Sequence, residues 1–278
     1  MKIMILGASG LLGKALMREW TKDETLGLGS RDVDIRDADH VRVVVEKARP
    51  DWIVLAAAYT NVDDCESHPD LAFSVNRDGT VNVAKAARQT GAKLLFLSSD
   101  YVFDGKKTSP YETDDARNPQ SVYGRSKAEA EIRLCEALPD CCVARTSWLF
   151  GTGGKCFPDT ILKLAASRPA LDVVNDQRGC PTYSVDLARA IIKLCRRGAR
   201  GIVHTTNSGD CSWFEFAREI IKGAGLAAEV RPVSSQQMAR PAPRPAYSVL
   251  SAKSLREYGI VMPTWEDALL RYLLERKN

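Results

Sequence analysis

Residues 2–20 read KIMILGASGLLGKALMREW, and this stretch decides the fold. Residues 2–6 form an apolar run typical of a buried strand, and residues 10–20 carry apolar side chains at helical spacing. Three glycines, Gly7, Gly10 and Gly13, join the two segments. A strand that leads through a glycine turn into a helix is the context that a dinucleotide-binding fingerprint requires.

Each glycine of this turn has a physical reason to be there. Gly7 permits the tight reversal, Gly10 lets the backbone approach a pyrophosphate, and Gly13 permits close packing of the helix on the strand. The free N–H groups of the first helical turn, which follow Ser9, then face the anion. The spacing Gly-x-x-Gly-x-x-Gly resembles that of the extended short-chain dehydrogenase/reductase superfamily.

The same alternation continues along the chain. It predicts strands over residues 25–28, 52–56, 93–98 and 142–146, and helices over residues 39–48, 70–90 and 121–138. Strands that alternate with helices predict an α/β fold, a Rossmann-like doubly wound parallel sheet.

After residue 150 the alternation of strands and helices becomes less regular. Apolar runs at 171–174 and 202–205 lie among predicted helices near Thr160, Val185 and Trp213. We therefore expect a dinucleotide-binding domain over residues 1–150 and a smaller C-terminal substrate-binding lobe over 151–278, with part of 183–210 returning to the first domain. Residues 231–245 are rich in proline and arginine, which predicts an irregular segment.

The bulk composition excludes several classes of protein. The 278 residues are 45% hydrophobic, with no run of about 18 apolar residues and no secretory leader, so we expect a cytoplasmic protein without a membrane anchor. The net charge is only +4, and basic residues alternate with acidic ones, which argues against nucleic-acid binding. The eight cysteines lack CxxC spacing and are expected to be buried thiols. The three histidines share no metal-ligand spacing, so no metal site is predicted.

The end of the second strand indicates which cofactor binds. Leu28-Gly29-Ser30-Arg31 lacks the acidic residue that normally binds the adenosine ribose of NAD. Ser30 and Arg31 are suited to a 2′-phosphate, which favours NADPH, with NADH as the alternative cofactor. A solvated loop charge is the competing interpretation of Arg31. Asp34 and Ile35 follow within reach of the adenine, and the small side chains of residues 56–58 (Ala56, Ala57 and Ala58) leave room for a cofactor.

A tyrosine and a lysine provide the candidate chemistry. Tyr123 and Lys127 stand at i and i+4 on one face of a predicted helix, and the fourth strand ends in Ser98-Ser99-Asp100-Tyr101. Ligands lie at the carboxyl edge of such a sheet, so Ser99 is expected beside Tyr123. We expect Tyr123 to protonate a carbonyl oxygen that accepts hydride, Ser99 to bind that oxygen, and the charge of Lys127 to ease proton donation and anchor the ribose. A chance Tyr-x-x-x-Lys pair on a helix surface is the bland alternative.

Together these motifs resemble the dTDP-4-dehydrorhamnose reductase family over nearly the whole chain. Residues 56–63 (AAAYTNVD) and 98–103 (SSDYVF) match its third- and fourth-strand segments. Further matches follow in order at 145–148 (RTSW), 175–177 (NDQ) and Arg244-Pro245. Tyr59 stands where many members have histidine, and Ser99 replaces the more usual threonine but retains the hydroxyl.

The resemblance implies an NADPH-dependent oxidoreductase that reduces the 4-keto group of dTDP-4-dehydro-L-rhamnose. It implies a nucleotide-sugar partner and a monomer or homodimer. It also implies cofactor contacts at Gly10, Leu11, Leu12, Asp34, Ile35, Ala58, Tyr59, Thr60, Tyr123 and Lys127. On the substrate side, Ser99, Asp100 and Trp148 are implied to line the sugar site beside Tyr101, and the guanidinium of Arg244 is suited to a diphosphate. Packing alone remains the alternative for Trp148, and solvation for Arg244.

Two other functions remain open at this point. The first is another enzyme on the same scaffold, either a reductase for a different deoxysugar or an epimerase or dehydratase. The second is a non-catalytic regulatory subunit of the methionine adenosyltransferase type, which could bind the cofactor without turnover. The complete set of Ser99, Tyr123 and Lys127 argues against the second.

Overall fold

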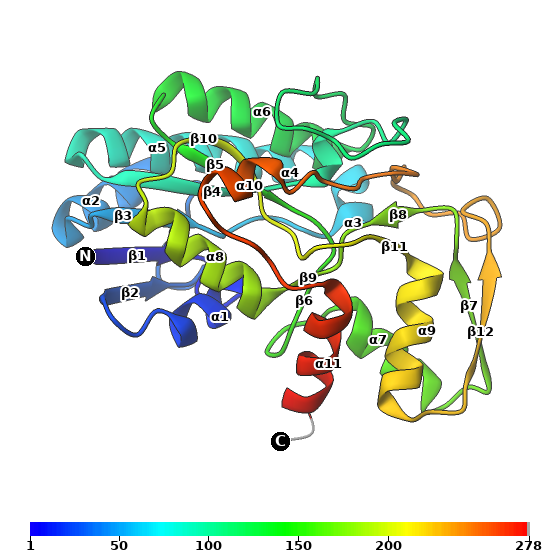
Figure 1. Ribbon diagram of the computed structural model, residues 1–278. Coiled ribbons are helices and arrows are strands. Elements are labelled where there is room, and N and C mark those ends of the chain that lie inside the picture. Colours follow the sequence, from blue (N-terminus) through cyan, green and yellow to red (C-terminus); the bar gives the residue numbers. More distant parts are fainter. Residues whose placement is uncertain (277–278) are drawn as a thin grey trace.

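The centre of the computed structural model, which describes residues 1–276, is a six-stranded parallel sheet in the order β10-β5-β4-β3-β1-β2 (Figure 1). Its strands are β1 (Lys2–Leu6), β2 (Glu24–Leu28), β3 (Trp52–Leu55), β4 (Lys93–Ser99), β5 (Cys142–Thr146) and β10 (Gly201–His204). The Rossmann-like fold predicted from the sequence is confirmed. Because β2 and β3 lie on opposite sides of β1, the carboxyl ends of β1 and β3 form the switch point at which such sheets bind ligands.

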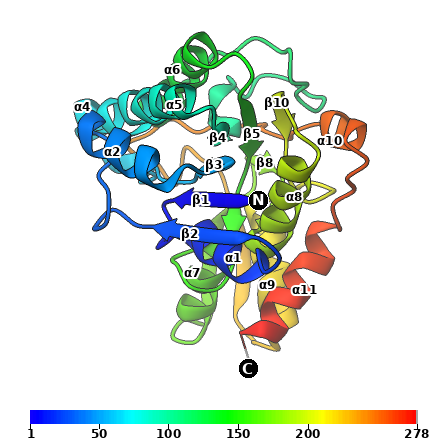
Figure 2. The ribbon, with the colours of Figure 1, turned by 90° about the vertical axis from the view of Figure 1, so that its left-hand side faces the viewer.

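Helices cover both faces of the sheet (Figures 1 and 2). On one face lie α1 (Leu11–Glu19) and α8 (Ser184–Arg196), packed on apolar side chains of β1, β3, β4 and β5. On the other lie α2 (Ala38–Ala48), α5 (Gly79–Thr90) and α6 (Val122–Ala137). Strands that are apolar on both faces are those of a buried parallel sheet.

A second, smaller layer forms at the carboxyl end of the sheet (Figure 1). It contains α7 (Phe157–Ala165), α9 (Trp213–Ala224), α11 (Trp265–Glu275) and the parallel pair β7 (Ala170–Val174) and β12 (Glu229–Val233). Aromatic side chains form its core, where Phe150 contacts Tyr183, Phe216 and Tyr272 at centroid distances of 5.5 Å. We call this layer the lobe. Strand β10 belongs to the central sheet, and α8 belongs to the helices that cover it.

Short elements complete the fold. They are α3 (Val62–Ser67), α4 (Pro69–Phe73), a π-helical turn (Ser74–Asp78), a 3₁₀ turn (Asp100–Val102), β6 (Leu149–Phe150), β8 (Arg178–Gly179), β9 (Thr182–Tyr183), β11 (Cys211–Ser212) and α10 (Lys253–Glu257). Among them β6 pairs with β9 in parallel and β8 pairs with β11 in antiparallel fashion.

The structure corrects two expectations about secondary structure. The helix expected over 70–90 is divided by the π-helical turn into α4 and α5. That turn contains Asn76, whose buried amide accepts a hydrogen bond from Tyr59 N (2.8 Å) and donates one to Ser126 Oγ (2.9 Å), and widened turns of this kind serve such local demands. The segment 231–245 is not irregular throughout, because residues 231–233 belong to β12. Pro232 is tolerated there because β12 pairs on one side only.

Two general properties hold for the described residues. None of their helices is long and apolar enough to cross a bilayer, and they contain no group of three or more His, Cys, Asp or Glu side chains arranged to hold a metal. All eight cysteines are free thiols, and Cys135 alone among them is partly exposed.

Replacing Gly13 by alanine tests the contact between α1 and the glycine turn. A Cβ at Gly13 would lie 2.1 Å from the carbonyl oxygen of Gly7, which is rigid backbone, whereas a Cβ at Gly10 would lie 3.2 Å from that oxygen. We expect Gly13→Ala to lower the free energy of unfolding by roughly 2 to 4 kcal/mol and the control Gly10→Ala by about 1 kcal/mol or less, measured by urea denaturation. Equal losses would contradict the packing role of Gly13.

Candidate active site

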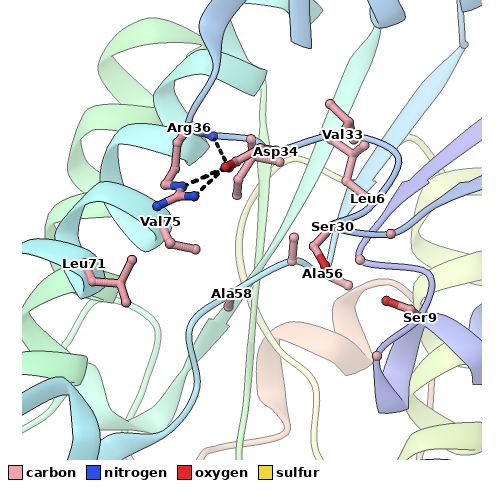
Figure 3. Close-up of a pocket in the computed structure, with 15 residues that line it drawn as sticks. Leu6, Ser9, Ser30, Val33, Asp34, Arg36, Ala56, Ala58, Leu71 and Val75 are labelled. Atoms are coloured by element: carbon pink, nitrogen blue, oxygen red, sulfur yellow. Dashed lines mark hydrogen bonds and ion pairs between the residues drawn. The ribbon is translucent and has the colours of Figure 1, made fainter. Parts of the chain in front are cut away.

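A cavity of about 400 Å³ lies at the switch point, beyond the carboxyl ends of β1, β2 and β3 (Figure 3). The cavity exists because several residues of its wall have small side chains or none. Gly7 has φ +93° and a Cβ there would lie 2.5 Å from Ala57 N, so the two backbones approach as closely as only glycine allows. The lining residues are Leu6, Gly7, Ser9, Gly10, Gly29, Ser30, Val33, Asp34, Ile35, Arg36, Ala56, Ala57, Ala58, Leu71 and Val75.

The structure places the candidate cofactor residues in two groups. Those that line this cavity are Gly7, Ser9, Gly10, Asp34, Ile35, Ala56, Ala57 and Ala58. The others lie at its margin or away from it. Leu11, Leu12 and Gly13 form the first turn of α1, whose N–H groups have no intrahelical acceptors. Tyr59 and Thr60 follow β3, and Arg31 is exposed and is not among the lining residues.

Arg36 lines the cavity and was missed by the sequence analysis. Its guanidinium donates to both carboxylate oxygens of Asp34, with Nε 3.0 Å from each of Oδ1 and Oδ2 (Figure 3). These hydrogen bonds lower the pKa of Asp34. The signal was present in the sequence, because Asp34 and Arg36 stand two residues apart in the loop after β2. The prediction rested on Arg31 because it is the first cation after the strand.

The phenol of Tyr123 lies at the carboxyl end of β4. Helix α6 begins at Val122, where the Ser121 side chain caps Gly124 N and the Glu66 carboxylate accepts from Val122 N at 2.7 Å. These bonds satisfy N–H groups of the first turn and fix the start of α6, next to which Tyr123 stands. The ring of Tyr123 meets that of Tyr101 edge-on, with centroids 5.6 Å apart.

Burial determines the protonation of Tyr123. It raises the pKa of the phenol well above its ordinary value, and the nearby hydroxyl of Ser99 opposes the shift. The net upward shift comes from desolvation of the buried ring. Tyr123 is therefore a neutral phenol at pH 7, which is the form that can donate a proton. That the charge of Lys127 eases proton donation from this phenol stays a prediction.

Lys127 lies one turn further along α6 and is 2% exposed. Its Nζ donates to the carbonyl oxygen of Leu97 at 2.6 Å and lies 4.0 Å from the centroid of the Phe96 ring. Burial lowers the pKa of Lys127 to about 7, and the charge of Glu131 opposes the shift. Its ammonium group is thus held against β4 by a carbonyl and an aromatic face.

Glu131, a further turn along α6, is fully buried and was not singled out from the sequence. Its carboxylate accepts from Arg145 Nε at 2.9 Å and Nη2 at 2.7 Å, from Arg117 Nε at 2.6 Å, and from the Ser98 hydroxyl. Although burial opposes it, these donors lower the pKa of Glu131. The sequence signal was a carboxylate at i+4 from Lys127 and i+8 from Tyr123, on the same helix face.

Residues 99–101 lie between Tyr123 and the lobe. The Ser99 hydroxyl donates to Asp100 Oδ1 at 2.9 Å, and burial raises the pKa of Asp100 to about 6. Asp100 Oδ2 is buried with no hydrogen-bond partner among residues 1–276. The phenol oxygen of Tyr101 accepts from Arg244 Nη1 at 3.3 Å, so Arg244 reaches the same edge of the sheet from the far end of the chain.

A larger cavity, of about 850 Å³, lies in the lobe and extends to Arg244. Its wall includes Arg168, Gln177, Trp213, Ser235 and Arg240. Trp148 is not among the lining residues.

Trp148 packs against a residue of this cavity's wall. Its ring stacks on Trp213 with centroids 3.5 Å apart and an interplanar angle of 6°, and a Cβ at Gly179 would lie 2.5 Å from it. Both rings are half-buried, and Trp213 is the one of the two that lines the cavity. That Trp148 contacts the sugar stays a prediction.

This geometry has close counterparts among known proteins. The family model described as RmlD substrate binding domain matches residues 1–277. The spore coat polysaccharide biosynthesis protein SpsK of Bacillus subtilis is 41% identical over 100% of this chain and 98% of its own, and a dTDP-4-dehydrorhamnose reductase of Sinorhizobium fredii is 39% identical over 100% of both. A crystal structure of dTDP-4-dehydrorhamnose reductase from Bacillus anthracis in complex with NADP superimposes with a TM-score of 0.96 at 39% identity, over 99% of both chains.

The matches run from end to end and include both the sheet and the lobe. They agree with the resemblance drawn from the motifs. The chain therefore belongs to the RmlD family, that of the dTDP-4-dehydrorhamnose reductases.

Proposed function

We propose that this protein is an NADPH-dependent oxidoreductase that reduces the 4-keto group of dTDP-4-dehydro-L-rhamnose to give dTDP-L-rhamnose. One observation carries the proposal. A neutral, buried phenol and a serine hydroxyl meet at the carboxyl edge of the sheet, close to a cavity suited to a dinucleotide and linked through Tyr101 and Arg244 to a larger cavity in the lobe. Relatives that match from end to end bear the name of this reductase, and one was solved with NADP.

The residues at the switch point fit a dinucleotide. The turn at Gly7 and the three alanines after β3 leave an open cavity where any side chain at Gly7 would meet backbone. The free N–H groups of the first turn of α1 suit a pyrophosphate. When bound, the cofactor supplies the hydride that reduces the substrate carbonyl.

Two side chains of this chain act on the substrate oxygen, and a third acts through Tyr123. Tyr123, kept neutral by burial, donates its proton to the oxygen as negative charge develops there. Ser99, whose hydroxyl donates to Asp100 Oδ1 in the structure, turns that proton to the same oxygen when the substrate binds. Lys127 provides a positive charge that stabilises the phenolate left by this transfer. Together with the hydride, the proton completes the reduction of the ketone to an alcohol.

The lobe cavity takes the rest of the substrate in this proposal. Arg244 lies where the cavity meets Tyr101, and Arg168 and Arg240 add positive charge to its wall. Guanidinium groups suit the oxygens of a diphosphate. Trp213 offers an apolar face to the base or sugar. The cytoplasmic location and the monomeric or homodimeric state expected from the sequence remain parts of the proposal.

An NADPH-oxidation assay tests the reaction directly. We expect dTDP-4-dehydro-L-rhamnose to be reduced with one NADPH consumed per sugar, and product stereochemistry is then determined by NMR. The GDP- and UDP-linked counterparts serve as comparison substrates. An epimerase or dehydratase regenerates its cofactor and would show no net oxidation, and a regulatory subunit would bind NADPH without turnover.

Replacing Tyr123 by phenylalanine tests the proton donor. We expect kcat to fall by about 10²- to 10⁴-fold, because general acid catalysis is lost while the ring and its packing remain. The dissociation constant for NADPH, followed by fluorescence, should change little. Tyr258→Phe is the matched control, since that phenol bonds only the backbone of Arg200 at the surface. Full activity of the Tyr123 variant would refute the role.

A pair of arginine variants tests cofactor recognition. We propose Arg36, rather than Arg31, as the ligand of the 2′-phosphate, because Arg36 lines the cavity. Arg36→Gln should raise KM for NADPH by roughly tenfold or more and change KM for NADH little, since a charge-assisted hydrogen bond is worth about 1.5–3 kcal/mol. Arg31→Gln should leave both constants nearly unchanged. The reverse pattern would assign the phosphate to Arg31.

A further inference from the structure

Residues 234–248, which we call the strap, run from β12 in the lobe back toward the sheet and α10 (Figure 1). The strap forms one wall of the larger cavity through Met238, Ala239, Arg240, Ala242, Pro243 and Arg244. The shape of that cavity therefore depends on what holds the strap in place.

At the lobe end the strap is tied by Ser235. Its N–H and hydroxyl donate to the carboxylate of Asp176 at 2.9 and 2.6 Å, and the hydroxyl accepts from Gln177 Nε2 at 2.7 Å. These residues follow β7, so this tie lies within the lobe.

Residues 240–244 of the strap contact the carboxylate of Asp63 in α3, and residues 246–248 pair with the backbone of Arg178. Asp63 Oδ2 accepts from Arg244 Nη2 at 3.0 Å and from Arg240 Nη1 at 3.5 Å, and Oδ1 accepts from Ala242 N at 3.3 Å. Although burial opposes it, Arg244, the backbone N–H of Ala242 and Arg240 lower the pKa of Asp63, so it is ionised at neutral pH. The contact joins residues more than 170 positions apart in the chain.

Asp63 and Tyr101 together leave one donor of the Arg244 guanidinium unpaired. Nη2 is taken by Asp63 and Nη1 by the phenol of Tyr101, whereas the buried Nε has no hydrogen-bond partner among residues 1–276. A buried, charged donor without a partner costs free energy unless a ligand satisfies it. Nη1 and Nη2 of Arg244 are thus held in place, while Nε stays available to an anion.

We propose that Asp63 is a positioning residue, which holds Arg244 in the orientation that receives the diphosphate of the nucleotide sugar. The inference rests on the proposed function, because the diphosphate belongs to its substrate. Asp63 does not compete with the diphosphate, since it binds Nη2 of Arg244 and leaves Nε unpaired. Ordering the side chain before binding reduces the entropy lost on binding.

Steady-state kinetics of Asp63→Asn test this role. We expect KM for the nucleotide sugar to rise by roughly tenfold or more, while kcat and the dissociation constant for NADPH stay within about threefold. Asp63→Glu, which retains the charge, should recover much of the loss. Asp140→Asn breaks an exposed ion pair with Arg200 and is the matched control, with unchanged constants.

A double-mutant cycle shows whether Asp63 acts through Arg244. In an Arg244→Gln background, Asp63→Asn should raise KM no further, because the group that it positions is gone. Additive effects would overturn the inference, as would an unchanged or lowered KM in the single variant. A fall in kcat equal to the rise in KM would point to a general disturbance of the fold and would also overturn it.

Calorimetric titration with dTDP separates this inference from the proposed function. If the wild-type protein reduces the sugar but Asp63→Asn binds dTDP as tightly as the wild type, the inference fails alone. If the protein shows no reduction but binds dTDP, with affinity weakened roughly tenfold by Asp63→Asn, only the proposed reaction fails. Absence of dTDP binding by the wild type would overturn both.

Discussion

The buried carboxylate of Glu131 is the interaction on which the candidate site depends. It joins α6 to the sheet through Arg145 on β5 and Ser98 on β4, and Arg117 covers it from the loop before the helix. Removal of one partner from such a buried pair leaves an uncompensated charge, which typically costs about 3–5 kcal/mol. Tyr123 and Lys127 lie on the same face of α6 as Glu131. The ion pair fixes the position of α6 along its axis and its rotation about that axis, and so places both side chains relative to the ends of the strands.

This anchoring lets burial tune the two groups in opposite directions. An enclosed phenol resists losing its proton, and an enclosed ammonium loses its proton more easily, so the pKa of Tyr123 rises while that of Lys127 falls to about 7. The two pKa values, which are similar for the free side chains, therefore move apart. A bound diphosphate-containing cofactor adds negative charge to the site, which favours the ammonium form of Lys127. The site is thus suited to donate a proton when an oxyanion forms beside it.

The two cavities lie at different places relative to the sheet and have different walls. The switch point between β1 and β3 provides a narrow cavity made of glycine and alanine, where the backbone itself is the binding surface. The lobe provides a wider cavity with arginine and tryptophan side chains in its wall. Ser99, Asp100 and Tyr101 leave β4 between the two, and the contact of Tyr101 with Arg244 connects them. A nucleotide sugar in the lobe would therefore present its sugar to the phenol of Tyr123.

Much of this could be predicted from the sequence alone, because the relevant signals are local. The glycine turn, the alternation of strands and helices, and the i, i+4 spacing of Tyr123 and Lys127 each follow from short-range sterics and periodicity. They predicted the Rossmann-like sheet and drew attention to its carboxyl edge. Tertiary structure decided what depends on distant partners. It placed Arg36 rather than Arg31 on the cavity wall and inserted a π-helical turn to bury Asn76. It also brought Asp63 to Arg244, because burial, desolvation and long-range ion pairs arise only when the chain has folded.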